Sequence, residues 1–345
     1  MAGHQGSVER VLGFGNAVVV RIRRQVQKLY ADGVARFSSR RTMERWSPSH
    51  FTEAAPELYW TSSRVVQGYL HELLSGDRSV SWAADVLRRH AGRGNARILV
   101  LGCGHGWLER VVAADSRVAQ VVAVDLSPAA IREATRLAIE AELDSKIRYE
   151  VVDLDRDELP RGPFDIVMAH GAIHHVRNLE GLFDRLAVVL GETGVLAFCE
   201  YVGPRRFAFD RKRERLLDEY LQSIPEEYRR LPQTGGVAVR GHRTDPRRLA
   251  LEDPSEAVRS DEIMPLVRSK LLVLEERPYG GSLLNPLLYE IIANFREGDE
   301  AGDAILRRLC AAERDLMRSG ELPSDFMVVE AKRREAGERE PSNRP

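Results

Sequence analysis

Short apolar runs alternate with stretches of helical spacing from Arg97 towards the end of the chain. This alternation is typical of parallel β-α-β units, in which a helix returns the chain to the same edge of the sheet after each strand. Helices are expected to begin near Trp107, Asn178 and Pro128, the last because Ser127 and Pro128 form a favourable N-cap and first-turn pair. Strands are expected at Arg97–Leu101, Val121–Val124, Ile147–Val152, Asp165–Ala169, Gly194–Glu200, Leu271–Arg277 and Phe326–Ala331. We therefore predict an α/β fold with a doubly wound, mostly parallel seven-stranded sheet.

Segments outside the sheet also have helical patterns. Residues 1–95 are rich in arginine and aromatic side chains, and their apolar spacing predicts a helical cap. Asn285–Gly320 is expected to form two further helices. An insertion after the fifth strand has a helical stripe, followed by the loop-like stretch Gln233–Pro254. The stripe consists of Phe209, Leu216, Leu217, Tyr220, Leu221 and Ile224. Because ligands bind at the carboxyl ends of strands in such sheets, we expect this insertion to be a lid.

These patterns divide the chain into five segments. We predict an N-terminal helical cap over residues 1–95, a ligand-binding core over 96–205 and a lid or substrate insertion over 206–265. Residues 266–331 are expected to supply the strands and helices that complete the sheet. Residues 332–345 are nearly all charged or turn-forming, and we predict a disordered tail there.

Composition excludes several classes of protein. With 51 Lys and Arg against 52 Asp and Glu, the net charge is −1, which argues against dominance by nucleic-acid or anionic-membrane binding. The longest early apolar run, Val11 to Val20, is about half of the roughly 20 residues that cross a bilayer, so neither a membrane span nor a signal peptide is expected. The three cysteines, Cys103, Cys199 and Cys310, are too scattered for a disulfide framework or a CxxC site. We expect a cytoplasmic protein.

A glycine-rich turn follows the first predicted strand. Glycines at positions 102, 104 and 106 allow a tight turn and a close approach of a ligand to the backbone. A dinucleotide fingerprint, GxGxxG, would have its third glycine at Trp107, and this chain has GxGxG instead. The spacing favours a nucleoside ligand without a pyrophosphate and disfavours a nicotinamide-dependent oxidoreductase.

Acidic residues follow the next two predicted strands. Asp125 ends the second strand, where an ionised carboxylate can accept hydrogen bonds from both ribose hydroxyls. Asp153 lies just past the third strand, where it could hold an adenine amino group. Together with the glycine turn, these two acids predict a site for an adenine nucleoside.

The ordered motifs resemble class I S-adenosylmethionine-dependent methyltransferases, more narrowly the bacterial small-molecule type. They are LxLGCGxG from Leu99, VDxSP from Val124, VxDLxxxxLP from Val151 and FDxVxAH from Phe164, followed by HHV. The resemblance implies a Rossmann-like methyltransferase fold and S-adenosyl-L-methionine as methyl donor. The donor contacts that it implies are Gly102, Cys103, Gly104, Gly106, Asp125, Leu126, Asp153, Leu154 and His170. In one departure, Val100 stands where the family usually has an acid for the methionine amino group.

Further segments, Glu200–Phe207 and Asp253–Ser260, resemble stretches of bacterial methyltransferases of mostly unassigned substrate. The implied activity is transfer of a methyl group to an N, O or C nucleophile of a small organic molecule, as in secondary metabolism. A tRNA or nucleic-acid methyltransferase and a non-catalytic donor-binding module are the alternatives. Basic residues cluster beside the lid, but few aromatic residues are interleaved with them as an RNA reader would need.

Proton removal and acceptor binding involve a second set of side chains. We expect His170, His174 and Glu200 to converge opposite the donor sulfur, because the carboxyl ends of neighbouring strands share one crevice. The residues expected to close over the acceptor are Tyr59, Trp60, Tyr201 and Phe207.

The three neighbouring histidines could also suggest zinc. We expect no metal, because the glutamate of an HExxH motif is missing and no nearby acid or cysteine completes a ligand set. His175 is expected to pack or to cap the following helix. The sequence favours neither a monomer nor an oligomer.

Overall fold

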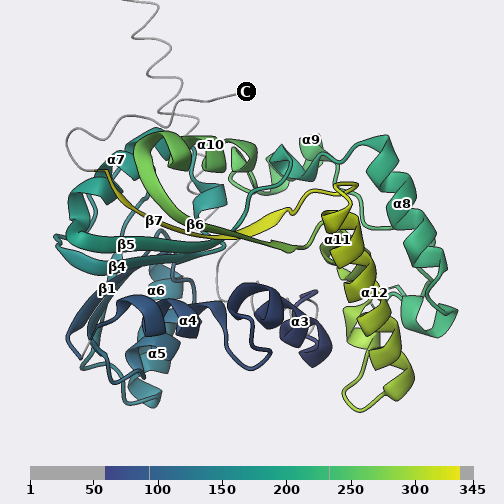
Figure 1. The fold of residues 1–345 in the computed structure, drawn as a ribbon, viewed down its shortest axis with the longest axis horizontal. Helices are drawn as coiled ribbons and strands as arrows, with labels where there is room; N and C mark the ends of the chain where they lie inside the picture. The colour runs from purple at the N-terminus through teal and green to yellow at the C-terminus, as the bar shows by residue number, and fades with distance from the viewer. Residues whose placement is uncertain (1–58, 93, 233, 335–345) are drawn as a thin grey trace, which may run out of the picture.

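The computed structural model describes residues 59–92, 94–232 and 234–334. A seven-stranded sheet lies at its centre, in the order β3-β2-β1-β4-β5-β7-β6 (Figure 1). Strands β1 to β5 run parallel to one another, and β7 is antiparallel to both β5 and β6. The bounds are β1 Ala96–Leu101, β2 Val118–Asp125, β3 Ile147–Val151, β4 Phe164–His170, β5 Leu190–Tyr201, β6 Leu271–Gly280 and β7 Phe326–Arg333. The predicted fold class is confirmed, and the strand order reverses between β1 and β4, where such sheets bind ligands.

Helices begin where the sequence signals indicate. The helix after β1 begins at Trp107, the one after β2 begins at Pro128 with a hydrogen bond from the Ala130 N–H to the Ser127 side chain, and Asn178 caps the helix after β4. The α-helices are α3 Arg64–Ser75, α4 Trp82–His90, α5 Trp107–Ala113, α6 Pro128–Glu140, α7 Leu179–Val189, α8 Arg211–Gln222, α9 Pro246–Glu252, α10 Ser260–Lys270, α11 Leu284–Leu288 and α12 Glu300–Arg318. Shorter 3-10 turns are η2 Ile173–His175, η3 Arg205–Phe207, η4 Glu226–Arg229 and η5 Ile292–Asn294.

One predicted loop contains a helix. The stretch Gln233–Pro254 includes α9, which begins at Pro246 after Asp245 accepts the backbone N–H groups of Arg247 and Arg248. None of the α9 residues is buried, so this helix has no apolar stripe for a periodicity argument to detect. Its cap and first-turn proline are the signals that identify it.

The ends of the chain extend beyond the described residues. The amphipathic helix expected near the N-terminus lies in residues 1–58, outside the described part. Strand β7 continues to Arg333, two residues beyond Ala331, where the predicted strand ends, because its last residues pair with the beginning of β6. Residues 335–345 of the expected tail lie outside the described part.

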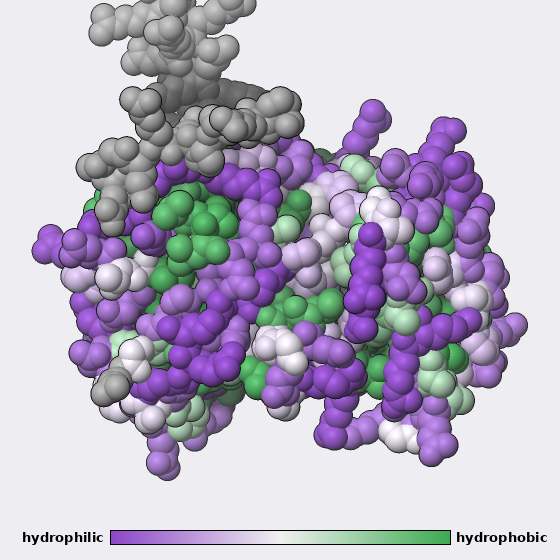
Figure 2. All heavy atoms as spheres, in the orientation of Figure 1, coloured by the Kyte–Doolittle hydropathy of each residue, from purple (hydrophilic) through white to green (hydrophobic). Residues whose placement is uncertain are grey.

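Helices cover both faces of the sheet (Figure 1). Along β1, Ile98 and Val100 face a core shared with α4 and α5, whereas Leu99 and Leu101 face a core shared with α7 and α10. This alternation follows from the two-residue period of a strand. In the described residues, no helix is long and apolar enough to span a membrane. On the face in Figure 2, hydrophobic residues gather in several separate areas between hydrophilic side chains.

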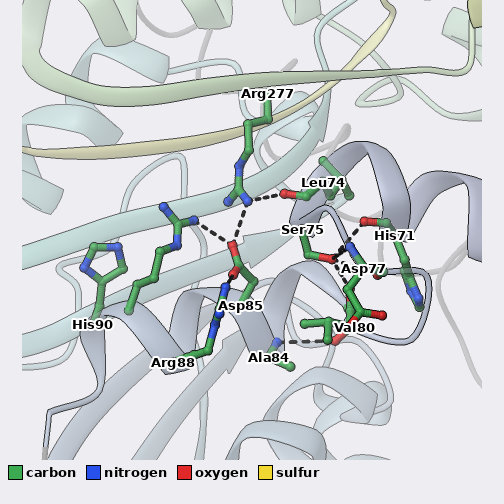
Figure 3. A network of polar contacts seen from close by, with 12 residues as sticks. His71, Leu74, Ser75, Asp77, Val80, Ala84, Asp85, Arg88, His90 and Arg277 are labelled. Carbon is green, nitrogen blue, oxygen red and sulfur yellow. Dashed lines mark hydrogen bonds and ion pairs between the residues drawn. The ribbon is translucent and has the colours of Figure 1, made fainter.

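A buried ionic network joins α4 to the antiparallel edge of the sheet (Figure 3). Arg277 of β6 lies 2.7 Å from Asp85 of α4 and 2.6 Å from Glu330 of β7. Glu330 also pairs with Arg89 and lies 2.7 Å from His90 Nε2. The carboxylates of Asp85 and Glu330 are almost fully buried, so this network fixes α4 against the sheet edge.

Candidate active site

The glycine turn between β1 and α5 uses left-handed backbone at Gly102, Gly104 and Gly106, with φ of 60°, 52° and 78°. A Cβ at Gly102 would lie 2.4 Å from the Cβ of Ala172, so this position packs tightly against the loop after β4. A Cβ at Gly104 would meet nothing within 4 Å. The open space over Gly104 is where a ligand can approach the backbone. Cys103, between them, is buried.

Asp125 holds this turn at the end of β2. Its Oδ2 accepts the N–H of Gly104 at 2.9 Å, and its Oδ1 accepts the N–H of Ser127 at 2.8 Å. Burial raises the pKa of Asp125, and the two N–H donors counter that effect. Each carboxylate oxygen retains lone-pair capacity for a further donor, so this carboxylate can accept the two hydroxyls of a ribose.

Asp153 lies at the same edge of the sheet. Asp125 is the register partner of Val151, and the Val152 N–H donates to the Asp125 carbonyl oxygen at 3.0 Å. Asp153 itself is half-buried, and its Oδ1 accepts the N–H of Asp155 at 2.9 Å. The half-buried side chains of Leu126 and Leu154 follow the two strand ends. The predicted ribose and adenine residues are therefore neighbours in space.

Val100, where the resemblance led us to expect an acid for the methionine amino group, is buried in the core that includes α4 and α5. Its side chain offers no polar atom for such a contact.

His170 ends β4 between two tryptophans that the sequence did not single out as site residues. Its ring stacks on Trp82 at 5.9 Å and meets the edge of Trp107 at 5.0 Å. The residue is exposed, and partial desolvation of its ring by the surrounding protein lowers the pKa of His170. A neutral imidazole at physiological pH can accept a proton. Trp82 is the first residue of α4, and Trp107 is the first residue of α5. Their place at the start of a helix is the only sequence signal that could have identified them.

Glu200 and His174 meet behind this edge. Glu200 ends β5 with 1% of its surface exposed, and its Oε1 accepts the N–H groups of Ala172 and Ile173 at 2.7 Å. Its Oε2 lies 2.7 Å from His174 Nδ1. Burial lowers the pKa of His174, but Glu200, with help from Glu256, outweighs that effect and raises the pKa to about 10. This pairing makes His174 a cation at neutral pH and favours His170 as the proton acceptor.

An aromatic group brings three of the predicted acceptor residues together. Tyr201 lies 4.4 Å from Phe207 and 5.3 Å from Phe326, and Phe326 lies 5.6 Å from Trp60. Tyr59 is 53% exposed and contributes no ring contact to this group. Phe326 was missed by the sequence analysis, and it joins the group because β7 places it opposite Tyr201. We refer to Trp60, Tyr201, Phe207 and Phe326 as the aromatic group.

The lid helix α8 is anchored beside the aromatic group. Arg213 of α8 is buried and donates to the Asp325 carboxylate at 3.0 Å and to the Ser282 carbonyl at 2.6 Å. Its guanidinium also lies 3.8 Å from the centre of the Phe209 ring. Because Asp325 directly precedes Phe326, this ion pair holds α8 close to the start of β7.

Comparisons with known proteins agree with this geometry. Residues 99–196 match the family described as a methyltransferase domain. An uncharacterized methyltransferase of Mycobacterium tuberculosis is 33% identical over 112 residues, which are 32% of this chain and 53% of that protein. A malonyl-acyl-carrier-protein O-methyltransferase of Legionella pneumophila is 33% identical over 113 residues, 32% of this chain and 38% of that protein. The chain thus spans about half or less of the length of these curated relatives.

A solved structure also matches over most of the length of this chain. The geranyl diphosphate C-methyltransferase of Streptomyces coelicolor A3(2) has a TM-score of 0.45 and 14% identity, over 81% of this chain and 100% of that chain. The matched family segment contains the glycine turn, Asp125, Asp153 and His170, on strands in the order described above. Residues 99–196 are therefore similar to a methyltransferase domain, and they lie in a sheet of the order β3-β2-β1-β4-β5-β7-β6.

Proposed function

We propose that this protein transfers the methyl group of S-adenosylmethionine to an N, O or C nucleophile of a small organic molecule. The observation that carries the proposal is the open space over Gly104 beside the Asp125 carboxylate. A backbone that a Cβ does not cover, next to a carboxylate with free lone pairs, fits a nucleoside with a ribose diol.

The chain's own residues divide the work between donor and acceptor. Gly102, Cys103, Gly104 and Gly106 form the backbone cradle, with Asp125 at the ribose. Donor contacts at the adenine come from Leu126, Asp153 and Leu154 and, at the methionine end, from His170. When bound, S-adenosylmethionine supplies a methyl group on a positively charged sulfur. Holding both reactants close together and excluding water then provides most of the acceleration.

Proton removal is assigned to His170. This histidine is exposed at the end of β4, and its lowered pKa leaves it neutral and able to accept a proton from an O–H or N–H acceptor. Glu200 and His174 hold the η2 turn in place rather than accept that proton, because their mutual hydrogen bond occupies them. The aromatic group provides an apolar wall for the acceptor, and its rings can attract the sulfonium.

A small acceptor is favoured over a nucleic acid by the charges around the lid. Three of the basic residues there are paired: Arg205 with Glu262, Arg213 with Asp325, and Lys212 with Glu321. Arg206 is directed to the backbone carbonyls of Asp253 and Glu256 instead. Paired cations leave little net positive charge for a phosphate backbone. All three cysteines are buried and none forms a disulfide, which supports a cytoplasmic location.

The test has two stages. Calorimetric titration should detect tight binding of S-adenosylhomocysteine and no heat with NAD or NADH. A screen of small-molecule acceptors with isotopically labelled S-adenosylmethionine should then find label in a product, and a tRNA pool should remain unlabelled. Label in tRNA would replace the acceptor assignment, and donor binding without transfer to any acceptor would favour a non-catalytic donor-binding module.

A further inference from the structure

Three side chains from two distant segments converge beside the end of β5. His174 and His175 belong to η2, and Glu256 belongs to the segment between α9 and α10. His174 Nε2 lies 3.5 Å from Glu256 Oε1, and His175 Nε2 lies 3.8 Å from Glu256 Oε2. One ligand atom from each residue lies within 4.8 Å of the other two.

Hydrogen bonds on the far side of each ring orient the two histidines. His174 Nδ1 lies 2.7 Å from the Glu200 carboxylate, which can only accept, so Nδ1 carries a proton. His175 Nδ1 lies 3.0 Å from Ser255 Oγ, whose own proton is directed to Asp253 Oδ1 at 2.7 Å. Ser255 therefore accepts from His175 Nδ1 as well. With a proton on Nδ1 of each ring, Nε2 of each ring is the atom that is directed towards the Glu256 carboxylate, and a metal ion there would displace the Nε2 proton of the His174 cation.

This arrangement is typical of a metal site. Histidines that bind a metal through one ring nitrogen usually donate the other N–H to a carboxylate or another oxygen, and such partners fix the tautomer and the ring orientation. Two imidazoles and one carboxylate are a ligand set that Zn²⁺ accepts with bonds of about 2.0–2.2 Å. In a tetrahedron of that size, ligand atoms lie about 3.3–3.6 Å apart. The separations of 3.5 and 3.8 Å between each histidine and a Glu256 oxygen are close to these values, and since the three ligand atoms lie within 4.8 Å of one another, binding needs a contraction of up to about 1 Å.

The surroundings hold the third ligand in place and are rich in negative charge. Arg206 Nη1 donates to the carbonyl oxygens of Asp253 and Glu256 at 2.9 Å, so the backbone that carries Glu256 is clamped. The Arg206 guanidinium and the His174 cation lie close to Glu256, and the carboxylates of Glu200 and Asp253 add negative charge around the two histidines. The side chains of His174 and Glu256 are only 10% and 19% exposed, so a bound ion would be largely shielded from water.

We propose that His174, His175 and Glu256 bind one divalent transition-metal ion of the zinc class, with Glu200 and Ser255 as positioning residues. Three protein ligands leave a fourth position for water or for an acceptor oxygen. Imidazole and carboxylate ligands favour Zn²⁺ or Co²⁺ over Mg²⁺, which prefers an all-oxygen shell. The site is separate from the donor cradle, and metal binding can be measured without methyl transfer.

The experiment uses the full-length chain without a histidine tag, stripped with a chelator. Calorimetric titration with Zn²⁺ should give one equivalent of binding, and Co²⁺ should give the visible absorption of a tetrahedral complex. Glu256→Gln should weaken Zn²⁺ binding at least tenfold and lose the Co²⁺ spectrum. Glu200→Gln should weaken it about 10- to 100-fold, as the loss of a positioning carboxylate does.

The matched control is Glu252→Gln, which makes the same charge change on α9 at an exposed residue paired with Arg248. It should bind Zn²⁺ as the unaltered chain does. S-adenosylhomocysteine binding by the Glu256→Gln chain reports whether it is folded, and if it is not, His175→Gln takes its place. The proposal is overturned if the unaltered chain binds no stoichiometric Zn²⁺, or if Glu256→Gln and Glu252→Gln bind it equally. Neither outcome bears on donor binding, which the S-adenosylhomocysteine titration measures separately.

Discussion

Asp125 holds the glycine turn and, in the proposed site, also binds the donor. Its carboxylate fixes the glycine turn through the Gly104 N–H and, in the proposed site, also receives the ribose. Gly104 in turn must lack a Cβ for two reasons, since its φ of 52° disfavours other residues and its open side is the ligand's approach. At the scale of single residues, donor affinity should therefore depend on these two positions.

Asp125→Ala is expected to weaken S-adenosylhomocysteine binding by tenfold or more. Each hydrogen bond to a charged group contributes about 1.5–3 kcal/mol, and the turn also loses its internal acceptor. Calorimetric titration measures the loss, and Asp144→Ala, at an exposed acid in the turn before β3, is the control. Equal affinity of the folded Asp125→Ala chain and the unaltered one would remove the ribose assignment.

His170→Gln is expected to lower kcat about 10²- to 10⁴-fold with an O–H or N–H acceptor, because a positioned base is lost. The donor Kd should change much less than kcat. Steady-state kinetics with the acceptor found in the screen gives this result, and His71→Gln, in α3, is the matched control. A near-normal kcat across pH 6–9 would assign His170 to packing between Trp82 and Trp107.

Glu109 makes stability depend on pH. Burial raises the pKa of this carboxyl to about 7, against a usual value of 4.5. Between these values the unfolded chain ionises while the folded chain holds the proton, so stability is lost as pH rises from 4.5 to 7. The free energy of unfolding of Glu109→Gln, relative to that of the unaltered chain, should therefore be higher at pH 8 than at pH 5 by on the order of 2–3 kcal/mol. Urea unfolding at both pH values tests this, and the exposed Glu158→Gln should show no such difference.

At the scale of the elements, charged side chains attach α4 to the sheet. Its Asp85, Arg89 and His90 all belong to the network around Arg277 and Glu330, so the helix is held by charges at one end. At its other end, Trp82 packs against His170. One helix therefore joins the ionic network at the sheet edge to the candidate active site.

Glu330→Gln should destabilise the fold by about 3 kcal/mol, because it removes the buried negative charge that pairs with the half-buried Arg277 and the partly exposed Arg89. The effect should appear as a lower denaturant midpoint with an unchanged slope. Glu276→Gln, which breaks the surface pair with Arg268, should cost no more than about 1 kcal/mol. Similar losses in the two variants would show that the network contributes no more than a surface pair.

At the scale of the whole molecule, the acceptor region is assembled from segments that are far apart in the chain. The aromatic group takes Trp60 from before α3, Tyr201 from the end of β5, Phe207 from η3 and Phe326 from the start of β7. The antiparallel pairing of β5 with β7 brings the last of these into place. Acceptor specificity should therefore respond to changes in any of these segments.

Phe207→Ala is expected to raise the acceptor KM at least fivefold while donor affinity stays within about twofold, because the half-buried ring faces Tyr201 and not the glycine turn. Steady-state kinetics and calorimetry separate the two effects. Phe295→Ala, whose ring stacks on Tyr228 away from the aromatic group, is the control. If Phe207→Ala and Phe295→Ala raised KM equally, the aromatic group would lie outside the acceptor site.

Local patterns determined much of this protein. Apolar runs predicted all seven strands, and Ser127 with Pro128 predicted the start of α6, because strand burial and helix capping act between residues close in sequence. The glycine turn and Asp125 were predicted as one site, since β1 and β2 are consecutive parallel strands whose carboxyl ends must meet. The exposed helix α9 was missed because it buries no apolar stripe.

Only the tertiary structure decided which side chains meet across long stretches of chain. Glu256 reaches His174 and His175 because the segment after α9 folds back over η2, and no local period encodes that contact. Phe326 joins Tyr201 because β7 inserts antiparallel between β5 and β6. The charge on His174 depends on the buried Glu200 beside it. Local propensity acts over a few residues, whereas burial and charge pairing depend on neighbours that the complete fold brings together.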